Sequence, residues 1–128
     1  MKKLFILVST LLFTASVFAA EFPDITIGDL KSAMAAKKVV LLDANGSDSW
    51  QAGHIPGAID FTAEKEQLAK ALPADKNALV VAYCGNPQCQ AYLGAAEAAK
   101  KLGYKNIKHL RAGIAGWKDA GEKTEKGS

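Results

Sequence analysis

Residues 78–91 read ALVVAYCGNPQCQA, and a helical segment from Tyr92 to Leu102 follows them. The stretch is typical of a short buried strand that ends in a Cys-Gly loop and opens at once into a helix. In that arrangement the N–H groups of the loop and the first N–H groups of the helix converge on one point, which attracts negative charge. A thiol at this point is stabilised as thiolate, the nucleophilic form of cysteine. We therefore take Cys84 as the candidate catalytic nucleophile.

Cys89 is the only other cysteine, and it lies in the same loop. A disulfide between the two would close a very short loop and restrict the unfolded chain little, so a purely structural role explains it poorly. We interpret Cys89 as a candidate resolving thiol, which attacks a persulfide or a sulfenic acid on Cys84. A free thiol that only fills space is the alternative. The cysteines and the two histidines match no zinc spacing, so no metal is expected.

The amino terminus is typical of a secretory signal peptide over residues 1–20. Met1–Lys3 is basic, residues 4–18 are mostly apolar, and cleavage is expected after Ala19 or Ala20. An uncleaved anchor is the alternative, although the run is short for a membrane span. We expect a bacterial export signal and a periplasmic or secreted product, without membrane contact after cleavage. Disulfides persist in such a compartment.

Length and charge limit the remaining possibilities. The 128 residues, 49% of them hydrophobic, are enough for one globular domain, expected over residues 21–122 with a loose tail over 123–128. Without Lys2 and Lys3 the 16 basic residues fall to 14, against 13 acidic ones, a net charge of +1. That balance does not favour nucleic-acid binding. We expect a monomer.

Strands and helices are predicted to alternate along the chain. Strands are expected at residues 39–44, 58–61, 78–83 and 106–110, and helices at 27–36, 62–71, 91–102 and near 117. The continuous apolar strands indicate burial on both faces, as in a parallel sheet. The predicted fold is a three-layer α/β/α domain with a mostly parallel central sheet. Thr62 is expected to cap the second long helix, and His109 is expected at the surface.

Three blocks of the sequence together resemble the rhodanese-like domain. The first block joins LLDA at residues 41–44 to GHIPGA at residues 53–58, and the second is the strand and loop around Cys84. The third comprises LGY at residues 102–104, LRAGI at 110–114 and WK at 117–118. The blocks stand in order near the family's spacing and cover nearly all of the chain after its leader.

The resemblance implies a sulfurtransferase. Cys84 would accept a sulfane sulfur as a persulfide from a small sulfur-containing anion or a persulfide donor, and would pass it to a thiol or protein acceptor. No metal or organic cofactor is implied. Asp43 would hold backbone N–H groups near the loops, and His54 would belong to a structural corner rather than act as an acid or base. The substrate-binding loop would comprise Gly85, Asn86, Pro87, Gln88 and Gln90.

Two positively charged residues of the family pattern are replaced by uncharged ones in this sequence. The usual loop Arg, five positions after the nucleophile, is Cys89 here, and Asn45 stands where an Arg usually follows the Asp of the first block. A lost charge-assisted contact weakens binding by about 1.5–3 kcal/mol, so we expect inefficient use of thiosulfate. Without a loop Arg to clamp phosphate, a related cysteine phosphatase is not expected. A thiol–disulfide redox module of Cys84 and Cys89, or a non-catalytic binding domain, are the alternatives to the sulfurtransferase.

Overall fold

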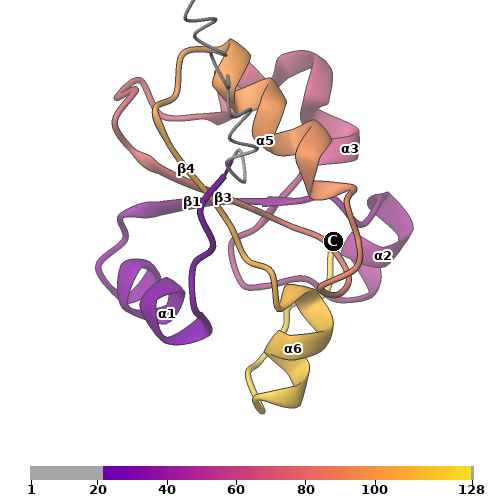
Figure 1. Ribbon diagram of the computed structural model, residues 1–128. Coiled ribbons are helices and arrows are strands. Elements are labelled where there is room, and N and C mark those ends of the chain that lie inside the picture. Colours follow the sequence, from indigo (N-terminus) through magenta and orange to yellow (C-terminus); the bar gives the residue numbers. More distant parts are fainter. Residues whose placement is uncertain (1–21, 128) are drawn as a thin grey trace, which may run out of the picture.

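The computed structural model describes residues 22–127, so the expected signal peptide lies outside the described residues. Its elements follow the predicted alternation of strands and helices (Figure 1). The strands are β1 (Val39–Asp43), β2 (Ile59–Asp60), β3 (Leu79–Tyr83) and β4 (Asn106–His109). The helices are α1 (Ile27–Ala35), α2 (Ser47–Ala52), α3 (Phe61–Glu64), the short 3-10 helix η1 (Lys65–Gln67), α4 (Leu68–Ala71), α5 (Tyr92–Lys101) and α6 (Gly113–Asp119).

The four strands form one parallel sheet in the order β2-β1-β3-β4. β3 lies between β1 and β4, which explains why its sequence is apolar on both faces. Asp43 at the end of β1 is in register with Tyr83 at the end of β3. The residues that follow β1 and β3 therefore meet at the carboxyl edge of the sheet, where α/β proteins build their sites.

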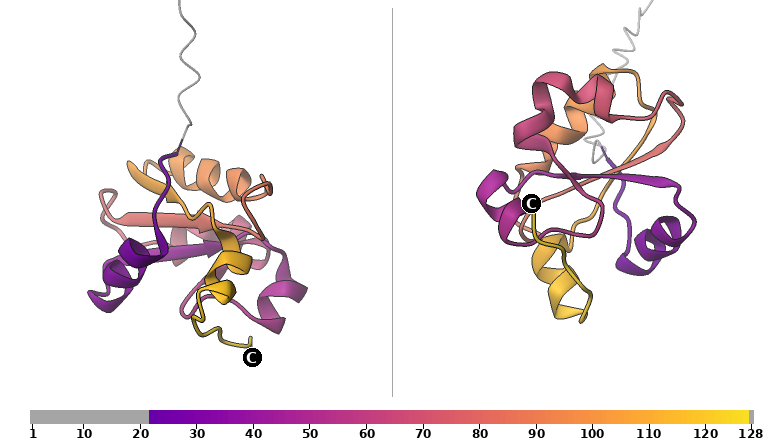
Figure 2. Two further views of the ribbon diagram at one scale, coloured as in Figure 1. Left: turned by 60° about the horizontal axis from the view of Figure 1, so that its bottom comes forward. Right: turned by 180° about the vertical axis from the view of Figure 1, so that it is seen from behind.

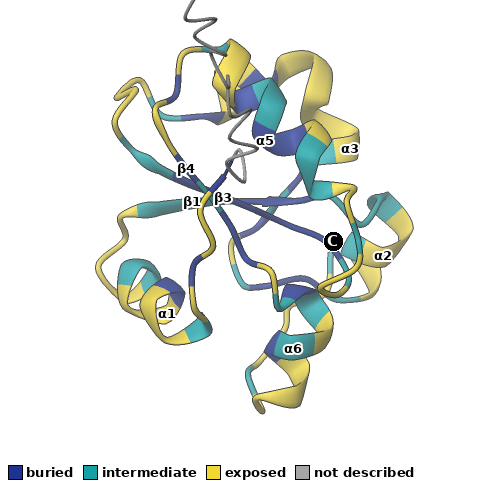
Figure 3. Cartoon of the chain, in the orientation of Figure 1, coloured by how far each residue is buried: buried dark blue, intermediate teal, exposed yellow. Residues whose placement is uncertain are grey.

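Helices cover both faces of the sheet, which confirms the three-layer prediction (Figure 2). Alternate residues of β3 contribute to opposite cores: Val80 and Ala82 to one, and Val81 and Tyr83 to the other. The strand is buried along nearly its whole length (Figure 3). The first core lies under α5 and α4. The second lies under α1 and α6, where Trp117 is buried. No helix of the described residues is long and apolar enough to cross a membrane.

The helix predicted after residue 62 begins differently. Asp60, rather than Thr62, is the N-cap, and its carboxylate accepts a hydrogen bond from the N–H of Ala63. The helical stretch then divides into α3, η1 and α4 instead of running on continuously. The expected buried residues Leu68 and Leu72 are nevertheless in the core. Both Asp and Thr are good caps, so the sequence alone does not decide between them.

Two expectations about exposure are wrong. His109 is buried, because its ring stacks on Tyr92 with 3.4 Å between the ring centroids. The tail after residue 122 is not loose over its described part. Glu125 exchanges two backbone hydrogen bonds with His54, and the N–H of Gly127 donates to the carbonyl of Gln51. Backbone pairing holds this polar tail, and such pairing leaves no apolar pattern in the sequence.

Candidate functional site

Cys84 is the first residue after the central strand, at the carboxyl edge of the sheet, as the sequence predicts. Only 1% of its surface is exposed, and its sulfur is bonded to that of Cys89 in a disulfide with 6.3 Å between the Cα atoms. Cys89 itself is half-buried. The two thiols that the sequence singled out are therefore brought into direct contact, with Cys89 as the more accessible partner.

The cysteine loop, residues 84–91, folds back on itself through Asn86. The side-chain oxygen of Asn86 accepts hydrogen bonds from the N–H groups of Gln88 (3.0 Å) and Cys89 (3.1 Å). This is the local turn that Asn favours, in which the side chain bonds the backbone two residues on. In the disulfide form, two amides of the expected anion cradle thus point at Asn86 rather than at a sulfur anion. The substrate-binding role of this loop stays a prediction.

Helix α6 supports the cysteine loop from behind. The N–H of Ile114 donates to the carbonyl of Cys84, and that of Ala115 to the carbonyl of Gly85, both at 2.9 Å. Gly113, at φ +64°, makes this approach possible: a Cβ at this residue would lie 2.6–2.7 Å from backbone atoms of residues 84–86. Only glycine adopts that conformation without strain and leaves the space free. The start of α6 therefore fixes the backbone on which Cys84 sits.

A buried polar network ties Cys84's neighbour to two other loops. The hydroxyl of Tyr83 donates to the carboxylate of Asp43 (2.7 Å) and accepts from the N–H of Ile55 (3.1 Å). The other oxygen of Asp43 accepts from the N–H of Asn45 at 2.8 Å. Asp43 therefore binds the N–H of Asn45 directly and the N–H of Ile55 through the Tyr83 hydroxyl. The network joins the ends of β1 and β3 to the corner at residues 53–58.

Burial controls the protonation of this network. It raises the pKa of Asp43, and the hydrogen bonds from Tyr83 and Asn45 oppose that shift. Burial also raises the pKa of the Tyr83 hydroxyl far above its ordinary value, and the neighbouring Asp43 charge adds to the effect. The Tyr83 hydroxyl is therefore protonated, and a hydrogen-bond donor, at neutral pH.

His54 belongs to the corner and not to the cysteine loop. It is buried, its Nδ1 lies 2.8 Å from the carbonyl of Trp50, and the two rings stack with 4.1 Å between centroids. Its Nε2 faces the carboxylate of Glu125 at 3.8 Å. The hydrogen bond that joins this corner to β3 comes from Ile55, the residue after His54, and not from His54 itself. These partners are those of a structural histidine, and a role in the chemistry of Cys84 stays untested.

Polar but uncharged groups surround the start of the cysteine loop. The loop carries no charged side chain, and Asn45 places its side-chain oxygen 3.7 Å from where a Cβ of Gly85 would stand. Arg111, the single Arg of the sequence, is exposed and follows β4 at the same edge of the sheet. The backbone N–H of Arg111 donates to the side-chain carboxylate of Asp24. Within residues 22–127, no group of three or more His, Cys, Asp or Glu side chains is placed to hold a metal ion.

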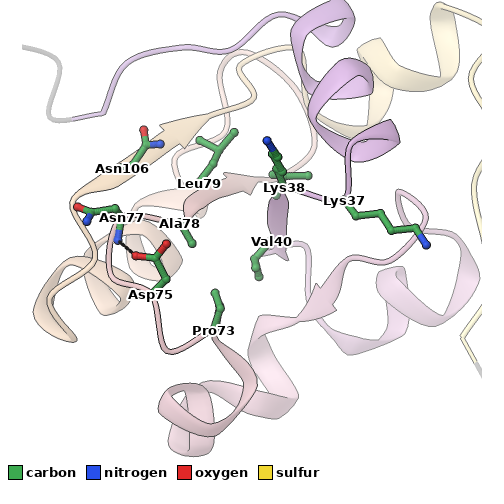
Figure 4. Close-up of a pocket in the computed structure, with 10 residues that line it drawn as sticks. Lys37, Lys38, Val40, Pro73, Asp75, Asn77, Ala78, Leu79 and Asn106 are labelled. Atoms are coloured by element: carbon green, nitrogen blue, oxygen red, sulfur yellow. Dashed lines mark hydrogen bonds between the residues drawn. The ribbon is translucent and has the colours of Figure 1, made fainter.

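A cavity of about 500 Å³ lies at the opposite end of the sheet (Figure 4). Val39, Leu79 and Asn106, which begin three of the strands, line it together with Lys37 and Lys38. It contains no residue of the cysteine loop. We place the candidate site at the carboxyl edge instead, because the two cysteines are there.

Sequence reasoning missed three residues that shape the site: Tyr83, Gly113 and Glu125. A hydroxyl at the end of an otherwise apolar strand was a signal for Tyr83, since a buried Tyr O–H requires a partner. A Gly at the first position of a short helix was a signal for Gly113. Glu125 left no signal, because it acts through a tail that lies far along the chain from its partner.

The fold and the site define an α/β domain with a cysteine loop at the carboxyl edge of a parallel sheet, and comparison with known proteins gives its family. The model of the rhodanese-like domain family matches residues 26–120, and the chain belongs to that family. A curated relative from Mycobacterium tuberculosis, the HTH-type transcriptional regulator Rv0324, is 32% identical over 115 residues, which are 89% of this chain and 50% of the relative. The chain thus spans half the length of that relative.

Solved structures of sulfurtransferases share the fold. The thiosulfate sulfurtransferase of Pseudomonas aeruginosa has a TM-score of 0.66 and 24% identity, over 85% of this chain and 21% of that one. The human single-domain sulfurtransferase TSTD1 has a TM-score of 0.59 and 22% identity, over 76% of this chain and 96% of that one. At these identities the likeness concerns the fold alone.

Proposed function

We propose that this protein is an exported sulfurtransferase that carries a sulfane sulfur on Cys84. The observation that carries the proposal is the place of Cys84, directly after the central strand and at the start of a loop that leads into α5. α6 holds the carbonyl groups of residues 84 and 85, which leaves the loop to form the surroundings of the sulfur. The family membership supports this choice of nucleophile.

The proposed reaction has two displacements. The Cys84 thiolate attacks the sulfane sulfur of the donor, a new S–S bond forms, and the donor leaves with the electron pair of its broken bond. A thiol or protein acceptor then attacks the terminal sulfur and leaves the Cys84 thiolate behind. In both steps sulfur moves between thiolate-type groups, so no cofactor is required.

The surroundings of Cys84 favour a persulfide donor over thiosulfate. Thiosulfate carries two negative charges, whereas the loop offers peptide dipoles and no fixed cation. Amide dipoles stabilise one negative sulfur, but a doubly charged anion gains most from an Arg fork. We therefore propose a low-molecular-weight persulfide or a protein persulfide as the donor.

The test is intact-mass spectrometry of the reduced protein after exposure to a stoichiometric persulfide donor. The expected result is a mass gain of one sulfur atom on Cys84, or products that derive from it, and no gain in Cys84→Ser. Equal labelling of the Cys84→Ser variant would refute the proposal and leave a binding domain. Comparison of thiosulfate with the persulfide donor at equal concentration tests the donor preference.

The Cys84–Cys89 disulfide favours a second candidate, a thiol–disulfide redox module. Such a module would exchange disulfides with partner proteins and never carry sulfane sulfur. The same measurement on Cys89→Ser distinguishes the two, because a sulfurtransferase retains the added sulfur on Cys84 in this variant, whereas a redox module that lacks its second thiol gains no sulfur atom.

A further inference from the structure

The sulfur atoms of Cys84 and Cys89 are bonded to one another within the cysteine loop. The turn at Asn86 sets the backbone of Cys89 back toward the end of β3, and the disulfide shows that the two Sγ atoms come within bonding distance. A persulfide on Cys84 would therefore form next to a second thiol. The lifetime of the persulfide then depends on whether the Cys89 thiol attacks it.

We propose that Cys89 resolves the Cys84 persulfide within the same chain and releases hydrosulfide, an inference that rests on the proposed function. The Cys89 thiolate attacks Sγ of Cys84, the bond between Sγ and the terminal sulfur breaks, and the terminal sulfur leaves as HS⁻ with that electron pair. The products are HS⁻ and the Cys84–Cys89 disulfide. The sulfane sulfur is reduced by two electrons, and the two cysteines together are oxidised by two.

The geometry selects Sγ as the point of attack. Attack on the terminal sulfur would only move the persulfide to Cys89, whereas attack on Sγ yields the pair that the structure contains. Cys89 reacts at the high effective concentration of a group in the same loop, which an external acceptor does not have.

The disulfide must be reduced before the next cycle, and its exposure indicates how. Cys89 is half-buried and Cys84 is buried, so an external thiolate reaches the sulfur of Cys89. Cys84 then departs as the thiolate that the next donor requires. A second thiol of the same reductant displaces Cys89 from the mixed disulfide. Each cycle therefore oxidises one molecule of a dithiol reductant and produces one hydrosulfide.

A single-turnover experiment tests this inference. Reduced wild type, Cys89→Ser, Cys89→Ala and Cys84→Ser receive one equivalent of glutathione persulfide with no other thiol present. Hydrosulfide is trapped with monobromobimane, and intact masses are recorded in parallel. Wild type is expected to release about one equivalent of hydrosulfide and to end two hydrogens lighter. Both Cys89 variants are expected to retain the added sulfur and to release at least tenfold less hydrosulfide.

The outcomes separate the two proposals. A wild type that keeps the added sulfur beside a free Cys89, with hydrosulfide release equal to that of the Cys89 variants, overturns the inference while the proposed function stands. Absence of any added sulfur on Cys84 in Cys89→Ser and Cys89→Ala overturns the proposed function itself. Cys84→Ser sets the background for hydrosulfide that the donor releases on its own.

Discussion

Replacement of Tyr83 by Phe tests whether the buried network holds the site together. The change removes one oxygen and no carbon, so it creates almost no cavity. It leaves the Asp43 carboxylate without its donor and the N–H of Ile55 without its acceptor. Asp43 and Ile55 are both fully buried, and water cannot replace the lost hydroxyl without entering the core.

The magnitude follows from the two bonds. A hydrogen bond to a charged group contributes about 1.5–3 kcal/mol, and one between neutral groups about 0.5–1.5 kcal/mol. We therefore expect Tyr83→Phe to lower the free energy of unfolding by about 2–4 kcal/mol, with a fall in Tm on the order of 10 °C. The loss of the Tyr83 donor also raises the pKa of Asp43 further, because that hydrogen bond opposes the effect of burial.

The assay is urea unfolding followed by the fluorescence of Trp50 and Trp117. Tyr104→Phe is the matched control: Tyr104 is also buried, and its hydroxyl donates only to the neutral carbonyl of Pro73. It should cost about 1 kcal/mol. A Tyr83→Phe variant that loses no more than this control would refute the argument that Asp43 and Tyr83 form the structural link behind Cys84.

Three further changes test other parts of the domain. Gly113→Ala places a Cβ 2.6–2.7 Å from the backbone of residues 84–86 at φ +64°, so the free energy of unfolding should fall by about 2–4 kcal/mol. The control is Gly121→Ala, at φ +77° with open space around it, which should lose about 1 kcal/mol in the same urea titration. Burial lowers the pKa of His109 below 6.5, so the unfolded chain binds the proton more readily and stability is lost as the pH falls through this range. His109→Phe keeps a ring on Tyr92 and should abolish that loss, which unfolding midpoints at pH 5 and pH 8 would show; an unchanged difference between the two pH values would contradict it. Burial raises the pKa of Asp43 above 3.8, so its contribution is greatest in acid and declines as the pH rises through the folded pKa. The unfolding free energy of wild type minus that of Asp43→Asn should accordingly be largest near pH 3 and smaller at neutral pH, and a difference that grows toward neutral pH would show that the sign is wrong.

The parts of the fold that depend on local pattern could be predicted from the sequence. The continuous apolar runs of β1 and β3 indicated a buried parallel sheet, and the structure has both strands in its centre. The N-cap of α1 follows a local pattern too, a Thr with an acidic residue three positions later, and the Thr26 hydroxyl accepts a hydrogen bond from the N–H of Asp29. Each of these features is decided within a few residues along the chain.

What the sequence did not reveal depends on partners far apart in the chain. His109 follows Lys108 on an edge strand and reads as exposed, but Tyr92, which covers it, comes from the start of α5. The tail pairs with Gln51 and His54 through backbone groups, which nearly every residue type offers. The turn of Asn86 lies within adjacent residues, but the sequence alone does not decide between the side-chain cap seen here and the substrate contact that the resemblance implies.

The absence of charge in the cysteine loop and the presence of Cys89 both favour the disulfide over the reduced pair. A fixed cation beside Cys84 would stabilise the thiolate and thereby the reduced pair, as low-pKa thiols do in strongly oxidising disulfide proteins. This loop has no charged side chain, and the place of the usual cation holds Cys89. The balance therefore shifts toward the disulfide, and the same substitution supplies the thiol that would expel the sulfur in the proposed cycle. In that cycle each turnover would consume one dithiol, so we expect the turnover rate to rise with the concentration of dithiol rather than with that of an anionic acceptor.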